Sequence, residues 1–401
     1  MFERGTIYDL LGDLVVYRNL EPMDGRLRGL RDIWAEVTNP LPMIEGRSPT
    51  TGGERGRQRL DAYRIPRKAE PAYARVVLHL LRQAQALRSD EPLRRLLYIG
   101  DTRMNDGRTI ASLGAHLPVR GFIAAERLEE PESVEVSEGV MYANRWGALA
   151  DFVDFLEGEG FPLDEGTAAI IDLDKTAFGA RGRNSHVIDA ARVEAVRRTA
   201  EEVLGGAFDE GTFRPIYDEL NRQAYHPFTG DNQDYLTYIC LMASGGVYPF
   251  DQLLDDLAAG RLTTFAEFIE ACDRRLRAEE AHGLLPVHQE VIANFRRGDP
   301  TPFKSFRYRE YEATVARMDV LPDGADPEEV LNHEIVLTRE VLDVARLFKE
   351  RGVLLFGLTD KPDEASIPSP DLAAQGYLPL HRVTMKVVGR TEPAPTSNTW
   401  E

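Results

Sequence analysis

Two hydrophobic patterns alternate along most of the chain. After Pro71, apolar residues recur at helical spacing, at positions 76, 77, 80, 81, 84 and 87, and the apolar run 96–99 that follows is typical of a buried strand. A helix from about 107, a strand at 121–125, a helix at about 146–156 and a strand at 168–171 continue the alternation. Strands that alternate with helices in this way predict a parallel sheet covered by helices.

A long stretch of helical periodicity interrupts this alternation between residues 187 and about 318. The alternation then returns with a helix that ends at Gly352, a strand at 353–356 and a last apolar strand at 383–388. We therefore predict an α/β fold in which a doubly wound parallel sheet carries an inserted all-helical domain.

The boundaries of these parts follow from the same patterns. The sheet domain is expected at 67–180 and 335–390, and the helical insertion at 181–334. Two units also suit a chain of 401 residues, which is longer than one hydrophobic core usually supports. Residues 1–66 receive no predicted role, although the run 14–17 predicts one strand, the turn-rich segment 47–57 predicts a mobile loop, and 391–401 is expected to be a loose tail.

Charge and composition narrow the possible partners and the location. A net charge of −18 repels polyanions, so nucleic acid is not an expected partner. Neither a signal peptide nor an apolar stretch long enough to cross a bilayer is present, which predicts a cytoplasmic protein without a membrane partner. Cys240 and Cys272 lie in apolar helical patterns and are expected to be buried thiols.

Polar residues follow three of the predicted strands. Asp172 and Asp174 follow the run 168–171, Asp101 follows the run 96–99, and Thr359 follows the run 353–356. Ligands of open parallel sheets bind beyond the carboxyl ends of the strands, so these side chains are expected to converge on one crevice.

Asp172 and Asp174 have the spacing of a nucleophile and a proton shuttle. Residues two apart on an extended chain point to the same side. The Asp172 carboxylate could attack phosphorus and form an aspartyl phosphate, which divides one difficult displacement into two easier ones. Asp174 could then protonate the leaving oxygen and later deprotonate the attacking water.

Clustered carboxylates that face a phosphate dianion require a cation. Oxygen ligands suit Mg²⁺, and Asp101 is the natural further ligand beside the Asp172 and Asp174 pair. The hydroxyl of Thr359 could donate to a phosphoryl oxygen, and a lysine could neutralise the charge on the equatorial oxygens.

These motifs resemble those of the haloacid dehalogenase superfamily of phosphatases and phosphotransferases. The segment Asp172-Leu-Asp-Lys-Thr176 is similar to its first motif, Leu358-Thr359 to its second, and Gly100-Asp101 with Asp106 to its fourth. The resemblance implies that Asp172 is the nucleophile, Asp174 the acid and base, and Thr359 a phosphate ligand. It also implies that Asp101 and Asp106 lie with Asp172 and Asp174 at a magnesium site, and that the helical insertion is a cap.

The order of the motifs departs from that family, because Asp101 precedes Asp172 in this sequence. A circular permutation would explain the order, since neighbours in a sheet need not be neighbours in sequence. The permutation implies that the phosphate-binding lysine of the third motif lies one helix before Asp101, where Lys68 stands. Lys361 and Lys386 remain the alternatives.

Other candidate residues keep two interpretations. Arg181 and Arg183 stand in a Gly-rich segment after Asp172 and could bind a substrate anion, or they could be ordinary surface arginines. Asp106 could cap the helix expected from about 107 instead of, or in addition to, binding metal.

The predicted function is Mg²⁺-dependent hydrolysis of a small organic phosphate monoester through an aspartyl phosphate on Asp172. Phosphoryl transfer to a second substrate, as in a phosphotransferase or phosphomutase, is the alternative within the enzymes. A binding protein that has lost turnover is the alternative from another class. The sequence does not determine the natural substrate or the oligomeric state.

Overall fold

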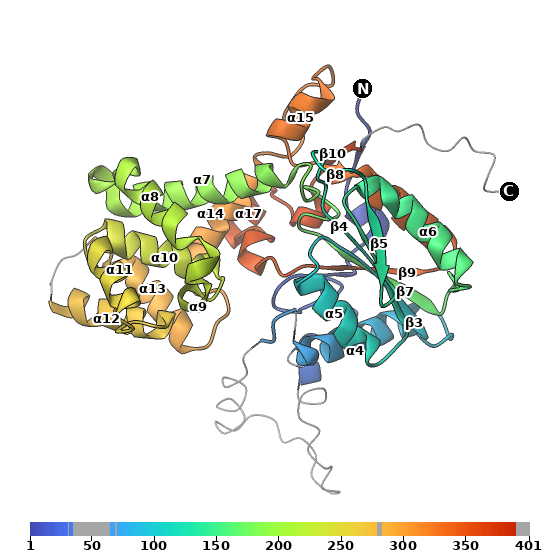
Figure 1. Cartoon of the computed structure of the whole chain (residues 1–401), viewed down its shortest axis with the longest axis horizontal. Coiled ribbons are helices and arrows are strands. Elements are labelled where there is room, and N and C mark those ends of the chain that lie inside the picture. The colour runs from blue at the N-terminus through green and yellow to red at the C-terminus, as the bar shows by residue number, and fades with distance from the viewer. Residues whose placement is uncertain (31, 35–64, 69, 279–282, 390–401) are drawn as a thin grey trace, which may run out of the picture. The chain divides into compact units, whose positions relative to one another are not determined.

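The computed structural model describes residues 1–30, 32–34, 65–68, 70–278 and 283–389, which excludes the predicted loop 47–57 and tail 391–401. The chain divides into two units (Figure 1). Of the described residues, those within 1–34, 66–190 and 314–389 form an α/β unit, and those within 191–313, together with residue 65, form a helical unit. The boundaries between the units, at 190/191 and 313/314, fall inside the helices α7 (Ser185–Leu204) and α14 (Lys304–Val315). The hydrophobic pattern predicts wider limits for the insertion, at 181–334.

The α/β unit contains a sheet of seven strands, in the order β2-β9-β7-β3-β4-β6-β5. All neighbouring strands are parallel except β5 and β6. The strands are β2 (Val15–Val16), β3 (Arg95–Gly100), β4 (Val119–Ala124), β5 (Val134–Ser137), β6 (Val140–Ala143), β7 (Thr167–Asp172) and β9 (Leu354–Leu358). The prediction of an α/β fold with a parallel sheet is confirmed.

The central strands are hydrophobic because they are covered on both faces. Every residue of β7 and β9 is buried, as expected for parallel strands that lie between two layers of helices. The apolar runs of the sequence therefore correspond to these strands within a residue or two.

Helices cover the sheet in two pairs. Helix α4 (Pro71–Arg88) packs on α5 (Asn105–Gly114), and α6 (Leu149–Gly158) packs on α16 (Arg339–Glu350). Crossovers between parallel strands are right-handed, and those through α5 and α16 run in opposite directions along the sheet, so the two pairs lie on opposite faces (Figure 1). Helix α16 ends before Gly352, whose φ of +84° stops the helix as predicted.

The first residues of the chain belong to this unit. The predicted strand 14–17 corresponds to β2, which forms an edge of the main sheet beside β9. The short helix α1 (Tyr8–Leu11) packs against β9 and α16. The segment to which the sequence assigned no role thus supplies part of the sheet.

Two features of the strands were not predicted. The hairpin of β5 and β6 extends the other edge of the main sheet, and all four residues of β5 are exposed, so it lacks an apolar run. The predicted last strand is β10 (Met385–Val388), which lies in a separate small sheet between β1 (Arg4–Gly5) and β8 (Leu337–Thr338).

The remaining helices of the α/β unit are α15 (Pro327–His333) and α17 (Pro370–Ala374). The helical unit is built around its own hydrophobic core, to which its helices contribute aromatic and aliphatic side chains. Those helices are α7 (Ser185–Leu204), α8 (Glu210–Leu220), α9 (His226–Thr229), α10 (Gln233–Ser244), α11 (Phe250–Ala258), α12 (Phe265–Ala278), α13 (Leu285–Arg296) and α14 (Lys304–Val315). Cys240 and Cys272 are free buried thiols in this core, as predicted.

Among the described residues, no helix combines the length and the apolar character that crossing a bilayer requires.

Candidate active site at the carboxyl ends of three strands

Three adjacent strands deliver the predicted polar residues to one edge of the sheet. Asp172 is the last residue of β7, which lies between β3 and β9. Asp101 directly follows β3, and Thr359 directly follows β9, where Asp172 is paired with Leu358. The convergence that the strand ends predicted is present in the structure.

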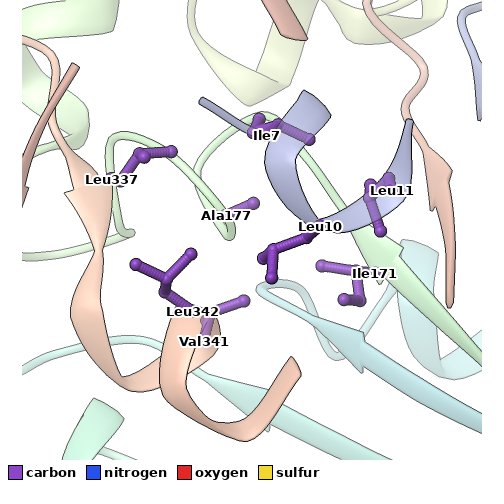
Figure 2. A pocket seen from close by; sticks show the side chains of 8 residues that line it. All are labelled: Ile7, Leu10, Leu11, Ile171, Ala177, Leu337, Val341 and Leu342. Atoms are coloured by element: carbon purple, nitrogen blue, oxygen red, sulfur yellow. The ribbon is translucent and has the colours of Figure 1, made fainter. Parts of the chain in front are cut away.

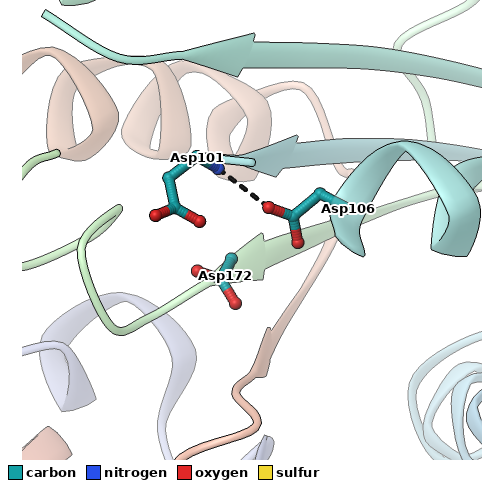
Figure 3. A group of neighbouring side chains, drawn as sticks. All are labelled: Asp101, Asp106 and Asp172. Atoms are coloured by element: carbon teal, nitrogen blue, oxygen red, sulfur yellow. Dashed lines mark hydrogen bonds between the residues drawn. The ribbon is translucent and has the colours of Figure 1, made fainter. Parts of the chain in front are cut away.

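Asp101, Asp106 and Asp172 form a compact group, here called the acidic cluster (Figure 3). One carboxylate oxygen from each lies within 4.8 Å of the others. All three residues are buried, with exposed fractions of 7%, 1% and 4%. Three buried carboxylates at this separation could bind a metal ion, because like charges in a site of low polarity require a cation.

Lys68 lies between two carboxylates of the acidic cluster. Its Nζ is 2.5 Å from Oδ1 of Asp172 and 2.6 Å from Oδ1 of Asp106. The residue stands three positions before α4, the helix that leads into β3. Because opposite charges at this distance favour both charged forms, Lys68 stabilises the cluster in the absence of a metal.

The two alternative lysines occupy other positions. Lys361 is buried, and its Nζ lies 3.7 Å from Oδ1 of Asp174. Lys386 is fully buried in the small sheet, where its Nζ lies 2.9 Å from the carboxylates of Glu334 and Asp319. The contact with Asp172 that supports a phosphate-binding lysine is therefore made by Lys68, at 2.5 Å.

Asp106 is held by the turn between β3 and α5. Its Oδ2 accepts hydrogen bonds from the backbone N–H of Asp101 and from the N–H and hydroxyl of Thr102, at 2.8–3.0 Å. Its Oδ1 accepts from the hydroxyl of Tyr98 at 2.8 Å and contacts Lys68. The N-cap of α5 is Met104, so Asp106 does not occupy the N-cap. Both carboxylate oxygens of Asp106 therefore already have partners. Asp101 and Asp172 accept fewer hydrogen bonds and can more readily bind a cation.

Thr176 contacts the predicted nucleophile directly. Its hydroxyl donates to Oδ2 of Asp172 at 3.1 Å, and its carbonyl accepts from the hydroxyl of Thr338 at 2.6 Å. The turn that returns Thr176 to Asp172 places Lys175 at a φ of +66°, which is unusual for a residue with a side chain. Thr176 is the last residue of the segment Asp172-Leu-Asp-Lys-Thr176, so the sequence motif includes it, but no role was predicted for it.

Asp174 lies beside the acidic cluster and is not part of it. The group of three metal-ligating side chains found among the described residues does not include Asp174, which was also predicted as a metal ligand. Its Oδ1 is buried and accepts no hydrogen bond, and Lys361 faces it at 3.7 Å. A carboxyl oxygen that is not fixed by a hydrogen bond suits a group that must exchange protons.

Thr359 is buried at the end of β9, with 2% exposure. Its backbone N–H donates to the carbonyl of Val16 on β2, and its Oγ1 accepts from the N–H of Lys361 at 3.1 Å. Within the described residues this leaves the hydroxyl hydrogen available to donate to a ligand, as the predicted phosphate contact requires.

Burial and mutual repulsion shift the ionisation of the acidic cluster. Burial and the charge of Asp106 raise the pKa of Asp101 to about 7, against the opposing charges of Arg181 and Lys68. Burial also raises the pKa of Asp172, although Lys68 opposes the shift. Burial would raise the pKa of Asp106 as well, but Lys68 and the hydrogen bonds of the turn hold it below its usual range. Carboxylates that bind metal must be deprotonated, so a cation would displace protons from Asp101 and Asp172.

The two arginines after Asp172 have different environments. The side chain of Arg181 is 36% exposed and its Nε donates to Oδ2 of Asp101. The side chain of Arg183 is 1% exposed and makes four hydrogen bonds, at 2.8–3.2 Å, to the carboxylates of Glu126 and Glu340. Arg183 joins the end of β4 to the start of α16, and its donors are used, so this position does not support the predicted contact with substrate.

We expect Arg183→Met to destabilise the protein by about 3–5 kcal/mol, because it leaves the buried carboxylate of Glu126 without its cation. Urea unfolding would measure the change. Arg351→Met is the control, since Arg351 pairs with Glu157 on the surface and its loss should cost less than about 1 kcal/mol. Equal effects of the two substitutions would contradict the structural role of Arg183.

A small apolar cavity of about 20 Å³ lies behind the strand that carries Asp172 (Figure 2). Its lining is entirely aliphatic and comes from α1, β7, β8, α16 and the loop after Asp172: Ile7, Leu10, Leu11, Ile171, Ala177, Leu337, Val341 and Leu342. A cavity of this size and polarity has no group to orient a charged ligand, so it is not a substrate site.

Comparison of the chain with models of known families, with curated proteins and with solved structures gave no match.

Proposed function

We propose that the chain is a Mg²⁺-dependent phosphatase that hydrolyses a small organic phosphate monoester through an aspartyl phosphate on Asp172. The observation that carries the proposal is the contact of Lys68 with Asp172 of the acidic cluster, at the carboxyl end of the interior strand β7. A carboxylate nucleophile, a fixed cation and further carboxylates within 4.8 Å are the components that phosphoryl transfer through an enzyme aspartate requires.

The proposed family is the haloacid dehalogenase superfamily, with a circular permutation of the motif order. In the sequence the order is Lys68, Asp101, Asp172 and Thr359, whereas in the sheet β7 lies between β3 and β9. Sheet adjacency thus brings Asp101, Asp172 and Thr359 to one edge whatever their order along the chain, and Lys68 joins them through its ion pair with Asp172, which supports the permutation. The helical unit, which is inserted in the sequence after Asp172, is proposed to be the cap domain of that family.

The proposed mechanism assigns one role to each group. An oxygen of Asp172 attacks phosphorus as the bond from phosphorus to the ester oxygen breaks, and Asp174 gives its proton to the departing oxygen. Asp174 then takes a proton from the water that attacks phosphorus, and the bond to Asp172 breaks to release phosphate. Lys68 and the hydroxyl of Thr359 hold the phosphoryl oxygens during both displacements.

Buried carboxylate oxygens are the ligands that Mg²⁺ prefers, so the acidic cluster fits this ion, with Asp101 and Asp172 as its proposed ligands. When bound, the ion neutralises charge between the carboxylates and the phosphoryl oxygens. The proposed role of Asp106 is to position other groups. Its carboxylate pairs with Lys68 and accepts a hydrogen bond from the backbone N–H of Asp101.

Phosphate release from a panel of small phosphate esters, with and without Mg²⁺, tests the function. We expect metal-dependent release, and we expect Asp101→Asn to raise the Mg²⁺ concentration needed for half-maximal rate by roughly tenfold or more. Asp151→Asn, an exposed position on α6, is the matched control and should leave the titration unchanged.

Other outcomes separate the alternatives. Phosphate that appears on an acceptor in place of free phosphate would indicate a phosphotransferase or phosphomutase. No turnover of any ester by the folded protein would favour a binding protein. An unchanged metal titration of Asp101→Asn would refute the assignment of Asp101 as a ligand.

A further inference from the structure

In the part of the chain that the structure describes, Lys68 and Arg181 contact the acidic cluster, and they differ in how firmly they are held. The Lys68 side chain is 7% exposed and touches two carboxylates, whereas the Arg181 side chain is 36% exposed and touches Asp101 alone within the cluster. Withdrawal of Lys68 would leave a buried ammonium, and it would leave the buried carboxylates of Asp106 and Asp172 without their shared cation. Withdrawal of Arg181 would leave a guanidinium that water can solvate.

The backbone of Arg181 is fixed even though its side chain is partly exposed. Its N–H donates to the carbonyl of Lys175 at 2.8 Å, and its carbonyl accepts from the N–H of Glu126 at 2.9 Å and from Nε1 of Trp146 at 3.1 Å. The next residue, Gly182, has a φ of +79°, and a Cβ there would lie 2.0 Å from the carbonyl oxygen of Glu126. Only the side chain of Arg181 is therefore free to change position.

The charges of the site favour such a change. Three carboxylates of the acidic cluster face the two monovalent cations Lys68 and Arg181, and the neighbouring Asp174 has Lys361 beside it. A divalent ion together with Lys68 would balance three carboxylates, and the charge of Arg181 would then be in excess. Arg181 also occupies an oxygen of Asp101, the residue with spare capacity for a metal.

We propose that Arg181 is the internal counter-ion of Asp101 and that a divalent cation binds by displacing it. The inference rests on the proposed metal site. Arg181 neutralises Asp101 while the metal is absent, and its side chain leaves Asp101 when the metal binds. Arg181 thereby lowers the affinity of the site for metal and stabilises the acidic cluster without one.

Calorimetric titration of the full chain with Mg²⁺ alone tests the exchange, at about pH 8.5, which lies above the pKa of about 7 of Asp101. We expect Arg181→Gln to bind Mg²⁺ roughly tenfold more tightly than the native chain, because the competing charge is removed. Arg103→Gln is the matched control. Arg103 is exposed on the turn after β3 and pairs with Glu135, so the same loss of charge should change the affinity by less than about threefold.

The variants distinguish failure of this inference from failure of the proposed function. Binding by the native chain that Asp101→Asn abolishes, with equal affinity in Arg181→Gln and native protein, would overturn the exchange and leave the metal site standing. Tighter binding by both Arg181→Gln and Arg103→Gln would also overturn it, because the effect would then be general electrostatics. No binding by any folded variant would overturn the metal site and the exchange together. Thermal unfolding of each variant checks that it is folded.

Discussion

Asp172→Asn is expected to reduce metal-dependent phosphate release by roughly a thousandfold or more, because an amide cannot form the aspartyl phosphate. The substitution should leave the fold intact. Burial and the neighbouring carboxylates raise the pKa of Asp172, which means that its ionised form is disfavoured in the folded protein, and a neutral side chain of the same shape relieves that cost.

The measurement is the rate of phosphate release at saturating ester and Mg²⁺, together with mass spectrometry of the peptide that contains residue 172 after rapid acid quench. The native chain should carry a phosphoryl group on that peptide and the variant should not. Asp151→Asn should match the native chain in both assays, since Asp151 is exposed on α6. Retention of turnover by Asp172→Asn, or a phosphoryl group elsewhere, would exclude Asp172 as the nucleophile.

Lys68→Met should lower both stability and activity. Its removal leaves Asp106 and Asp172 buried without their shared cation, and breaking a buried pair in this way costs about 3–5 kcal/mol. Urea unfolding measures this loss. Lys349→Met is the control: Lys349 is exposed on α16 and donates only to the exposed carbonyls of Asp9 and Leu10 among the described residues, so its loss should change stability by less than about 1 kcal/mol.

The pH dependence of the stability loss shows whether it arises from the missing charge of Lys68 or from lost packing. Without Lys68, the pKa values of Asp106 and Asp172 rise in the folded state, so the penalty is present at high pH and is relieved as the carboxylates take up protons. The difference in stability between native and Lys68→Met should therefore shrink between about pH 8 and about pH 5. The double variant Lys68→Met/Asp106→Asn should lose less stability than the two single changes added together. A penalty that is independent of pH and additive would show that Lys68 acts only through packing.

The order of hydrophobic runs determined the fold class. Runs of four or five apolar residues between helical periods correspond to β3, β4, β7 and β9, because parallel strands covered on both faces have to be apolar throughout. The same rule fails for β5, whose four residues are exposed at the sheet edge. It identified the strand 14–17 that corresponds to β2, but not the place of that strand in the sheet. The β5–β6 hairpin and the place of β2 in the sheet are set by pairing with neighbouring strands that are distant in sequence or lie at an edge.

The sequence predicted the part of the candidate site that stands at the ends of strands. Asp172, Asp101 and Thr359 converge because adjacent parallel strands end at the same edge, and this rule requires no knowledge of side-chain contacts. Lys68 was predicted from the resemblance to the motifs of a known family. Its ion pair with Asp172 at 2.5 Å could not be predicted and is seen only in the tertiary structure.

The partner of each charge was decided only by the tertiary structure. Arg181 and Arg183 are two residues apart in one Gly-rich segment, yet one reaches Asp101 at the edge of the site and the other is buried between Glu126 and Glu340. Asp106 is engaged by Thr102, Tyr98 and Lys68, and Tyr98 belongs to an apolar run that predicted only a buried strand. The sequence determined which chemical groups stand at the strand ends, because hydrophobic periodicity is local. Which of them are free to act depends on ion pairs between distant segments, and those exist only once the chain has folded.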